Sequence, residues 1–156
     1  MQASTETTSA SAHRVAEQML ALWHYCLSDA SRLYAVLEEL RIGLTDMKLL
    51  HHLSVLPEPV TVKELAEHMR LSLPGASRAA DALTKRGWLT RQEDAHDRRM
   101  KRLAITAEGR DVLRRVEEAR MAGLEHVIAG VPTVDLDRLS EAIDPILARL
   151  EERKNA

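Results

Sequence analysis

Residues 60–110 constrain the fold more than any other part of the chain. They contain two short helical patterns joined by a tight connection, followed by two strand-length segments at residues 88–93 and 101–105. A polar tip, residues 96–99, lies between these segments and suits a hairpin loop. A helix pair followed by a basic hairpin is an arrangement that grips a DNA duplex. We therefore predict a mainly α fold with a small β-hairpin wing, a winged helix-turn-helix.

Residues that favour helix N-termini precede the predicted helices of this region: Thr45, Thr61, Ser72 and Thr106. The spacing from Thr61 to Glu64 is that of a capping box, in which each residue bonds the backbone amide of the other. The helix that starts at Ser72 is expected to end near Arg86, because Gly87 easily adopts a left-handed conformation.

Longer apolar helical patterns flank this region. The first runs over residues 12–43, and its apolar stripe is broader than a small domain can cover by itself. The last begins at Thr133 and contains Pro145, which should kink or divide it. We predict a disordered N-terminal tail at 1–11, an N-terminal dimerisation helix at 12–43, the winged helix-turn-helix at 44–110 and C-terminal dimerisation helices at 111–153.

Composition narrows the cellular setting. The chain is 45% hydrophobic but only 3% aromatic, so its core must be aliphatic. No apolar run approaches the roughly 20 residues of a membrane span, and the polar start lacks the apolar region of a secretion signal. One cysteine, Cys26, cannot form an internal disulfide, which suits a reducing compartment. We expect a cytoplasmic protein with no membrane partner.

The distribution of charge indicates a nucleic-acid partner, although the net charge of the chain is −2. Residues 72–106 carry eight Lys and Arg against four Asp and Glu, a local charge of +4 that leaves −6 for the remainder. A basic module in an acidic frame concentrates positive potential on one face, as duplex-binding proteins do. Double-stranded DNA is the expected partner.

Specific contacts follow from the predicted geometry. The helix that starts at Ser72 would enter the major groove with its N-terminal side chains nearest the base edges. Arg78 suits a bidentate bond to guanine, but it can instead pair with Asp81 or Asp97. The predicted DNA-binding residues are Ser72, Pro74, Gly75, Ser77, Arg78, Lys85, Arg98, Arg99 and Lys101.

The cations of this region have different expected roles. Arg98 and Arg99 at the hairpin tip would reach phosphate or an adjacent minor groove, where narrow A/T tracts attract arginine. The alternative is that Arg98 and Arg99 are solvated and contact no partner. Screened phosphate contacts or simple solvation are expected for Lys85, Arg86, Lys101 and Arg102.

The segment 71–110, LSLPGASRAADALTKRGWLTRQEDAHDRRMKRLAITAEGR, resembles the recognition helix and wing of the MarR family, the multiple-antibiotic-resistance regulators. The family's wing signature D-x-R-x-x-x-x-x-L-T is matched by Asp97, Arg99, Ile105 and Thr106, with Ile105 in place of Leu. The resemblance implies a homodimer, joined through its first and last two helices, that represses by binding a pseudo-palindromic operator and is released by a small ligand.

The resemblance also implies structural roles in the wing for Asp97, which pairs with an arginine in that family, and for Thr106. One departure is notable. Leu73, Pro74 and Gly75 occupy positions where family members often carry Ser or Thr, which leaves fewer side chains to contact bases.

Small-ligand, metal and redox sites have weaker signals. Trp23, His24, His51 and His52 are candidates to line a pocket for a phenolic or aromatic anion, but they suit an interface or core equally well. We expect no metal, because adjacent His51 and His52 point about 100° apart on a helix. Cys26 lies on an apolar stripe, where a thiol is usually inert.

No catalytic motif appears, so we expect neither an enzyme nor a cofactor. The alternatives left open are a winged-helix module for protein contacts and a redox- or metal-responsive regulator.

Overall fold

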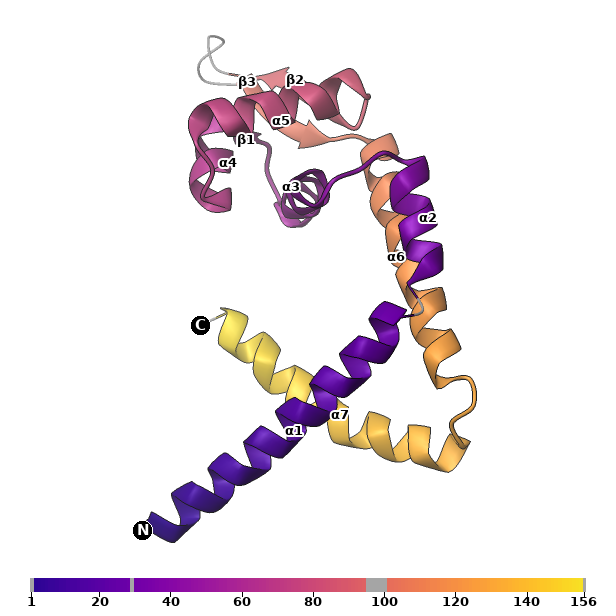
Figure 1. Ribbon diagram of the computed structural model, residues 1–156. Coiled ribbons are helices and arrows are strands. Elements are labelled where there is room, and N and C mark those ends of the chain that lie inside the picture. Colours follow the sequence, from indigo (N-terminus) through magenta and orange to yellow (C-terminus); the bar gives the residue numbers. More distant parts are fainter. Residues whose placement is uncertain (1, 29, 95–100, 156) are drawn as a thin grey trace. The chain divides into compact units, whose positions relative to one another are not determined.

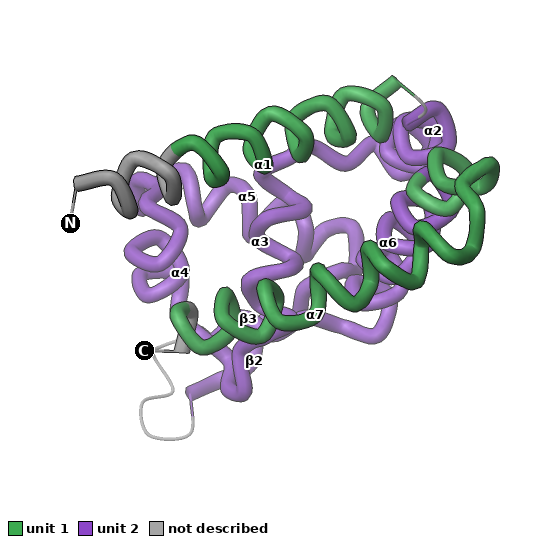
Figure 2. Tube along the Cα trace, turned by 90° about the horizontal axis from the view of Figure 1, so that it is seen from below, with its two compact units in different colours: residues 1–29, 124–156 green, residues 30–123 purple. Residues whose placement is uncertain are grey.

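The computed structural model describes residues 2–28, 30–94 and 101–155. Most of this chain is helical, with one small antiparallel sheet (Figure 1). Two compact units are present, one formed by residues 30–123 and the other by residues 1–29 and 124–156 (Figure 2).

The unit at 30–123 contains the winged helix-turn-helix. Its elements are α2 (Ser31–Glu39), α3 (Leu44–Val55), β1 (Val60–Thr61), α4 (Val62–Met69), α5 (Leu73–Lys85), β2 (Leu89–Glu93), β3 (Lys101–Ile105) and the first part of α6 (Ala107–Ile128). The predicted fold class, mainly α with a hairpin wing, is confirmed.

The sheet has one strand more than the sequence predicted. Its order is β1-β3-β2, with Leu89 opposite Ile105 in the hairpin and Val60 opposite Leu103 at the other edge. The sequence pattern missed β1 because this strand has only two residues and passes directly into α4. β1 ties the start of the helix-turn-helix to the wing.

Local capping bonds define the helix starts. Thr61 donates its amide to Glu64 Oε2 at 2.7 Å and its Oγ1 accepts from the Glu64 amide at 3.2 Å, which confirms the capping box. The expectation of a cap at Thr45 was wrong. The N-cap is Gly43, two residues earlier, and α3 begins at Leu44, because the amide of Gly43 is satisfied by Asp46 Oδ2 at 3.3 Å.

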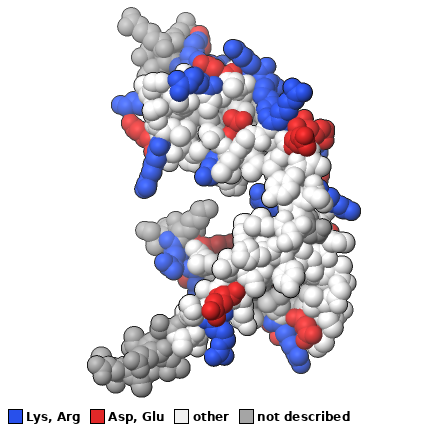
Figure 3. Space-filling view, in the orientation of Figure 1, with Lys and Arg blue, Asp and Glu red and all other residues white. Residues whose placement is uncertain are grey.

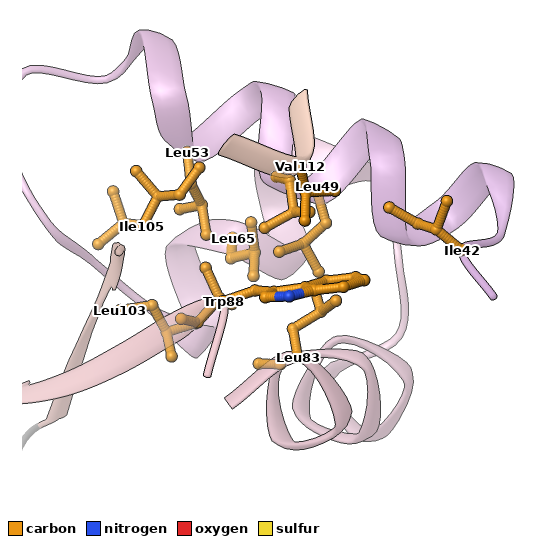
Figure 4. Packing of buried hydrophobic residues seen from close by; sticks show 13 residues of the cluster. Ile42, Leu49, Leu53, Leu65, Leu83, Trp88, Leu103, Ile105 and Val112 are labelled. Atoms are coloured by element: carbon orange, nitrogen blue, oxygen red, sulfur yellow. The ribbon is translucent and has the colours of Figure 1, made fainter. Parts of the chain in front are cut away.

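An aliphatic core joins the helices to the sheet. Leu49 of α3, Leu65 of α4, Leu83 of α5 and Leu103 of β3 are all fully buried, and they meet around Trp88 (Figure 4). Each such burial contributes about 1.5–3 kcal/mol. Because every element of the winged helix supplies a residue, this core holds α5 and the wing in a fixed relation.

The other unit contains α1 (Gln2–Ser28), the end of α6 and α7 (Thr133–Asn155). The predicted single helix over 12–43 was wrong, because α1 ends at Ser28 and α2 begins at Ser31. The Ser28 hydroxyl donates to the carbonyl of His24 at 2.8 Å, a side-chain bond that competes with the helix ladder. The tail at 1–11 was expected to be disordered, but α1 begins at Gln2. A helical start is reasonable physically, because extending an existing helix adds one hydrogen bond for each residue. α7 continues through Pro145 as one helix.

Large apolar side chains of α1 and α7 are exposed. They are Val15, Met19, Leu20, Leu22, Trp23, Tyr25 and Leu27 of α1, and Val134, Leu139, Ile143, Ile146, Leu147 and Leu150 of α7. Within the described residues, none of the helices combines the length and the hydropathy that crossing a bilayer requires. The dimerisation role assigned to residues 12–43 and 111–153 stays a prediction.

Candidate nucleic-acid interface

α5, the second helix of the helix-turn-helix, has two distinct sides. Ala76, Ala80 and Leu83 are fully buried against the core, at the spacing of one helix face. Arg78 and Lys85 lie on the exposed side. The helix therefore presents cations outward from a rigid support.

The start of α5 uses its polar groups for capping. Ser72 Oγ accepts the amide of Gly75 at 3.2 Å, so neither group is free to make the same bond to DNA. A Cβ at position 75 would lie 3.0 Å from Ser72 Oγ, which makes glycine the fitting residue beside this cap. Pro74 has no amide hydrogen. The first turn consequently offers few donors, while Leu73 and Pro74 remain exposed.

Two cations on α5 remain available. Of the two acidic partners predicted as alternatives for Arg78, Asp81 instead forms an ion pair with Arg91 of β2, and Asp97 lies outside the described residues. Neither Arg78 nor Lys85 makes an ion pair with any acidic side chain that the structure describes. Both are exposed, and they lie seven residues apart on the same helix. Among the described residues, no acidic side chain therefore compensates the positive charge of these two residues.

Arg86 has a different role from the expected phosphate contact. Its Nη1 donates to the carbonyl of Arg41 at 2.9 Å and its Nη2 donates to the carbonyl of Leu40, at the C-terminal end of α2. The guanidinium also lies 3.5 Å from the ring centroid of Trp88. Helix C-termini leave carbonyls without partners, and Arg86 satisfies two of them. It thereby ties α2 to the end of α5.

Arg102 is likewise occupied rather than solvated. It forms an ion pair with Asp94, which is only 6% exposed, donates Nη1 to the carbonyl of Pro59 at 2.9 Å, and lies 3.6 Å from Glu64 Oε2. The bond to Asp94 is the main reason that the pKa of the Arg102 guanidinium is raised above its ordinary value. These bonds fasten the far end of the β2–β3 hairpin to the turn before β1. Neither the bond from Arg102 to the Pro59 carbonyl nor the Arg86 bonds could be predicted from the sequence, because no local pattern identifies acceptors that lie 43 to 46 residues away.

The root of the hairpin is held by Thr106. Its amide donates to the carbonyl of Trp88 at 3.1 Å and its hydroxyl donates to the carbonyl of Gly87 at 2.7 Å. Its Oγ1 also accepts the amide of Gly109 at 3.0 Å, which confirms the predicted cap of α6. Gly87 has φ +76°, the left-handed conformation expected of it.

The far end of the hairpin is only partly described. Lys101 Nζ bonds Glu93 Oε1 at 2.9 Å across the last described pair of the two strands. The predicted tip residues Asp97, Arg98 and Arg99 lie outside the described residues. In Figure 3, Lys and Arg side chains gather over the region in which Figure 1 draws α5, β2 and β3, with some acidic side chains among them.

A groove of about 540 Å³ lies between α3 and α6, and none of its lining residues belongs to α5. Apolar side chains form much of its wall, among them Met47, Leu113 and Val116. Polar groups come from Lys48, His51 and Ser54 of α3 and from Arg114, Glu117 and Arg120 of α6. Of the predicted pocket residues, His51 therefore lines a cavity. Trp23 and His24 lie on α1, in the other unit, where both are exposed.

His52 does not line this groove. Its ring meets that of His68 edge to face, with centroids 5.2 Å apart, and its Nε2 is buried without a hydrogen-bond partner among the described residues. Burial, followed by the charges of His68 and His51, lowers the pKa of His52. The described residues contain no cluster of three or more metal-binding side chains.

Comparison with known proteins gives the geometry a family context. Residues 42–100 match the model of the MarR family. Over 89 residues the chain is 34% identical to the transcriptional repressor MprA of Escherichia coli, in strain K12 and in O157:H7 alike. This alignment covers 57% of the chain and 51% of the relative, so the chain spans about half the length of the curated relatives it matches.

Solved structures share the fold over most of the chain. The transcriptional regulator Tm0710 of Thermotoga maritima superposes with a TM-score of 0.76 at 20% identity, covering 92% of this chain and 99% of that one. The S. aureus MepR F27L mutant, bound to an oligodeoxyribonucleotide, superposes with a TM-score of 0.65 at 17% identity, covering 88% and 97%. At these levels of sequence identity, the structural similarities establish a shared fold only. Together with the match at residues 42–100, they confirm the predicted resemblance of the winged helix-turn-helix to the MarR family.

Proposed function

We propose that this protein is a sequence-specific DNA-binding transcription regulator, a homodimeric repressor of a pseudo-palindromic operator. The observation that carries the proposal is the exposed side of α5, where Arg78 and Lys85 have no described acidic partner. In a helix-turn-helix the second helix enters the major groove, and unpaired cations there neutralise phosphate or bond base edges. The repressor MprA and the DNA-bound MepR structure support this reading by analogy.

DNA binding is tested by fluorescence anisotropy over a salt series, on duplexes recovered from a genomic fragment pool and on a random duplex. We expect log affinity to fall by about 0.9 per neutralised phosphate for each decade of salt. Arg78→Ala should mainly reduce the difference between recovered and random duplexes. Replacing Arg98 and Arg99 by Ala should weaken both alike.

Arg138→Ala is a matched control, since Arg138 is an exposed arginine of α7, 3.4 Å from Asp135. It should leave the affinity for both duplexes unchanged. A flat salt dependence of wild-type affinity would refute phosphate contact, and with it this function.

Dimerisation is supported by the apolar side chains exposed in the unit that contains α1 and α7. Leu139, Ile143, Ile146 and Leu150 follow one another at helical spacing, and Trp23 of α1 is 60% exposed. Monomeric proteins rarely expose contiguous apolar surface of this extent. A second copy of the chain is the partner that a pseudo-palindromic operator requires, because its two half-sites are related by two-fold symmetry.

Sedimentation equilibrium tests this part of the proposal. Wild type should have twice the 17.5 kDa mass of the chain, and Ile146→Glu should shift the equilibrium toward the monomer. Val55→Glu is the control, because Val55 is 64% exposed but lies on α3. A wild-type monomer at micromolar concentration would contradict the dimer.

Release by a small aromatic or phenolic anion is the third part. The groove between α3 and α6 combines apolar walls with Lys48 and His51, the combination that holds an organic anion. In a thermal-shift screen, phenolic acids should raise the melting temperature of wild type, and Lys48→Glu should reduce that rise. Absence of any shift, with unchanged operator affinity in the presence of these acids, would count against an effector site here.

A further inference from the structure

The N-terminal end of α5 is apolar where a DNA-contacting helix usually carries polar side chains. Leu73 is the first residue of the helix and is 53% exposed, and Pro74 beside it is exposed as well. The core does not explain this exposure, because the buried side of α5 starts at Ala76. Leu73 and Pro74 therefore belong to the exposed side of α5.

The polar groups around Leu73 are already engaged or lie further along the helix. Ser72 Oγ accepts the amide of Gly75. Asp81 is paired with Arg91. Arg78, the nearest cation on α5, is five residues beyond Leu73, more than one turn along. The first turn thus presents an apolar surface flanked by positive charge.

The major groove offers a matching group. Among the base edges displayed there, thymine alone carries an exposed methyl, at C5, and apolar side chains contact it. The N-terminal residues of the second helix are those nearest the base edges. An exposed leucine at the first helical position suits a thymine methyl and offers no hydrogen bond to any base.

We propose that Leu73, with Pro74 beside it, contacts the C5 methyl of a thymine in each operator half-site and so determines part of the sequence preference. This inference rests on the proposed function, that α5 enters the major groove. The start of α5 would distinguish thymine from other bases through its methyl group. Arg78 would distinguish bases through hydrogen bonds.

The test exchanges thymine for deoxyuridine in the recovered operator, which removes the methyl and retains every base-pairing group. Anisotropy titrations compare wild type and Leu73→Ala on the two duplexes. Wild-type affinity should fall about fourfold for each contacted methyl, the value of one buried CH₂ group. Leu73→Ala should bind the thymine duplex more weakly than wild type, and the difference in its affinity for the two duplexes should be smaller than in wild type.

Two controls isolate the contact. Deoxyuridine placed only between the half-sites should leave wild-type affinity unchanged. Val55→Ala, which truncates an exposed apolar residue of α3, should keep the thymine preference intact. Circular dichroism checks that Leu73→Ala is folded, which its exposed position favours.

The outcomes separate this inference from the function on which it rests. Equal wild-type affinity for the thymine and deoxyuridine duplexes overturns the inference and leaves DNA binding standing. A thymine preference as large in Leu73→Ala as in wild type overturns the role of Leu73. Failure of wild type to bind any duplex overturns the inference together with the proposed function.

Discussion

Gly109→Ala should destabilise the protein, although replacing glycine by alanine inside a helix ordinarily does the opposite. Gly109 is the third residue of α6 and is buried where that helix crosses the entry to β2. A Cβ at this position would lie 2.3 Å from the carbonyl oxygen of Trp88 and 2.9 Å from Ile105 Cγ1. The oxygen is backbone, and it already accepts the amide of Thr106 at 3.1 Å. The carbonyl oxygen of Trp88 therefore cannot move away from the new Cβ as the end of a flexible side chain could.

The magnitude follows from two opposing effects. Alanine gains about 1 kcal/mol over glycine in a helix interior. Overpacking of a close-packed site costs about 1–3 kcal/mol, and a contact with backbone belongs at the upper end of that range. We expect a net loss of about 2 kcal/mol in the free energy of unfolding.

Urea unfolding followed by circular dichroism measures this loss. Gly130→Ala is the matched control, since a Cβ there meets nothing within 4 Å, and it should change stability by no more than about 0.5 kcal/mol. The reasoning is refuted if Gly109→Ala is as stable as wild type or more stable, because the close approach of α6 to Trp88 would then not constrain the residue.

Two further predictions concern charged groups of the same unit. Burial above all lowers the pKa of His52 below its ordinary 6.5, so the unfolded chain binds that proton first as the pH falls. The free energy of unfolding should therefore decrease between about pH 7.5 and about pH 5.5, and the decrease should be smaller in His52→Leu; an equal decrease would contradict this. Arg102→Ala should lower the urea midpoint more than Lys101→Ala, because Arg102 joins buried Asp94 to another part of the chain whereas the Lys101 pair is exposed. Equal midpoints for these two variants would show that the network contributes nothing.

Features that depend on neighbouring residues were predictable from the sequence. The capping box at Thr61, the Ser72 cap of α5, the left-handed Gly87 and the hairpin that follows it all appear as expected. Caps and turns are decided by bonds that reach three or four residues. The order of α3, α4, α5, the hairpin and α6, and hence the winged helix, could therefore be inferred without the structure.

The tertiary structure decided which cations are available to a ligand. The sequence predicts phosphate contacts or solvation for Arg86 and Arg102, but Arg86 bonds a carbonyl 46 residues away and Arg102 bonds one 43 residues away. The short strand β1 escaped prediction for the same reason, since its partner β3 is distant in sequence. Composition assigns charges to a region, but only the folded chain brings distant acceptors close enough to engage some of those charges and leave Arg78 and Lys85 exposed.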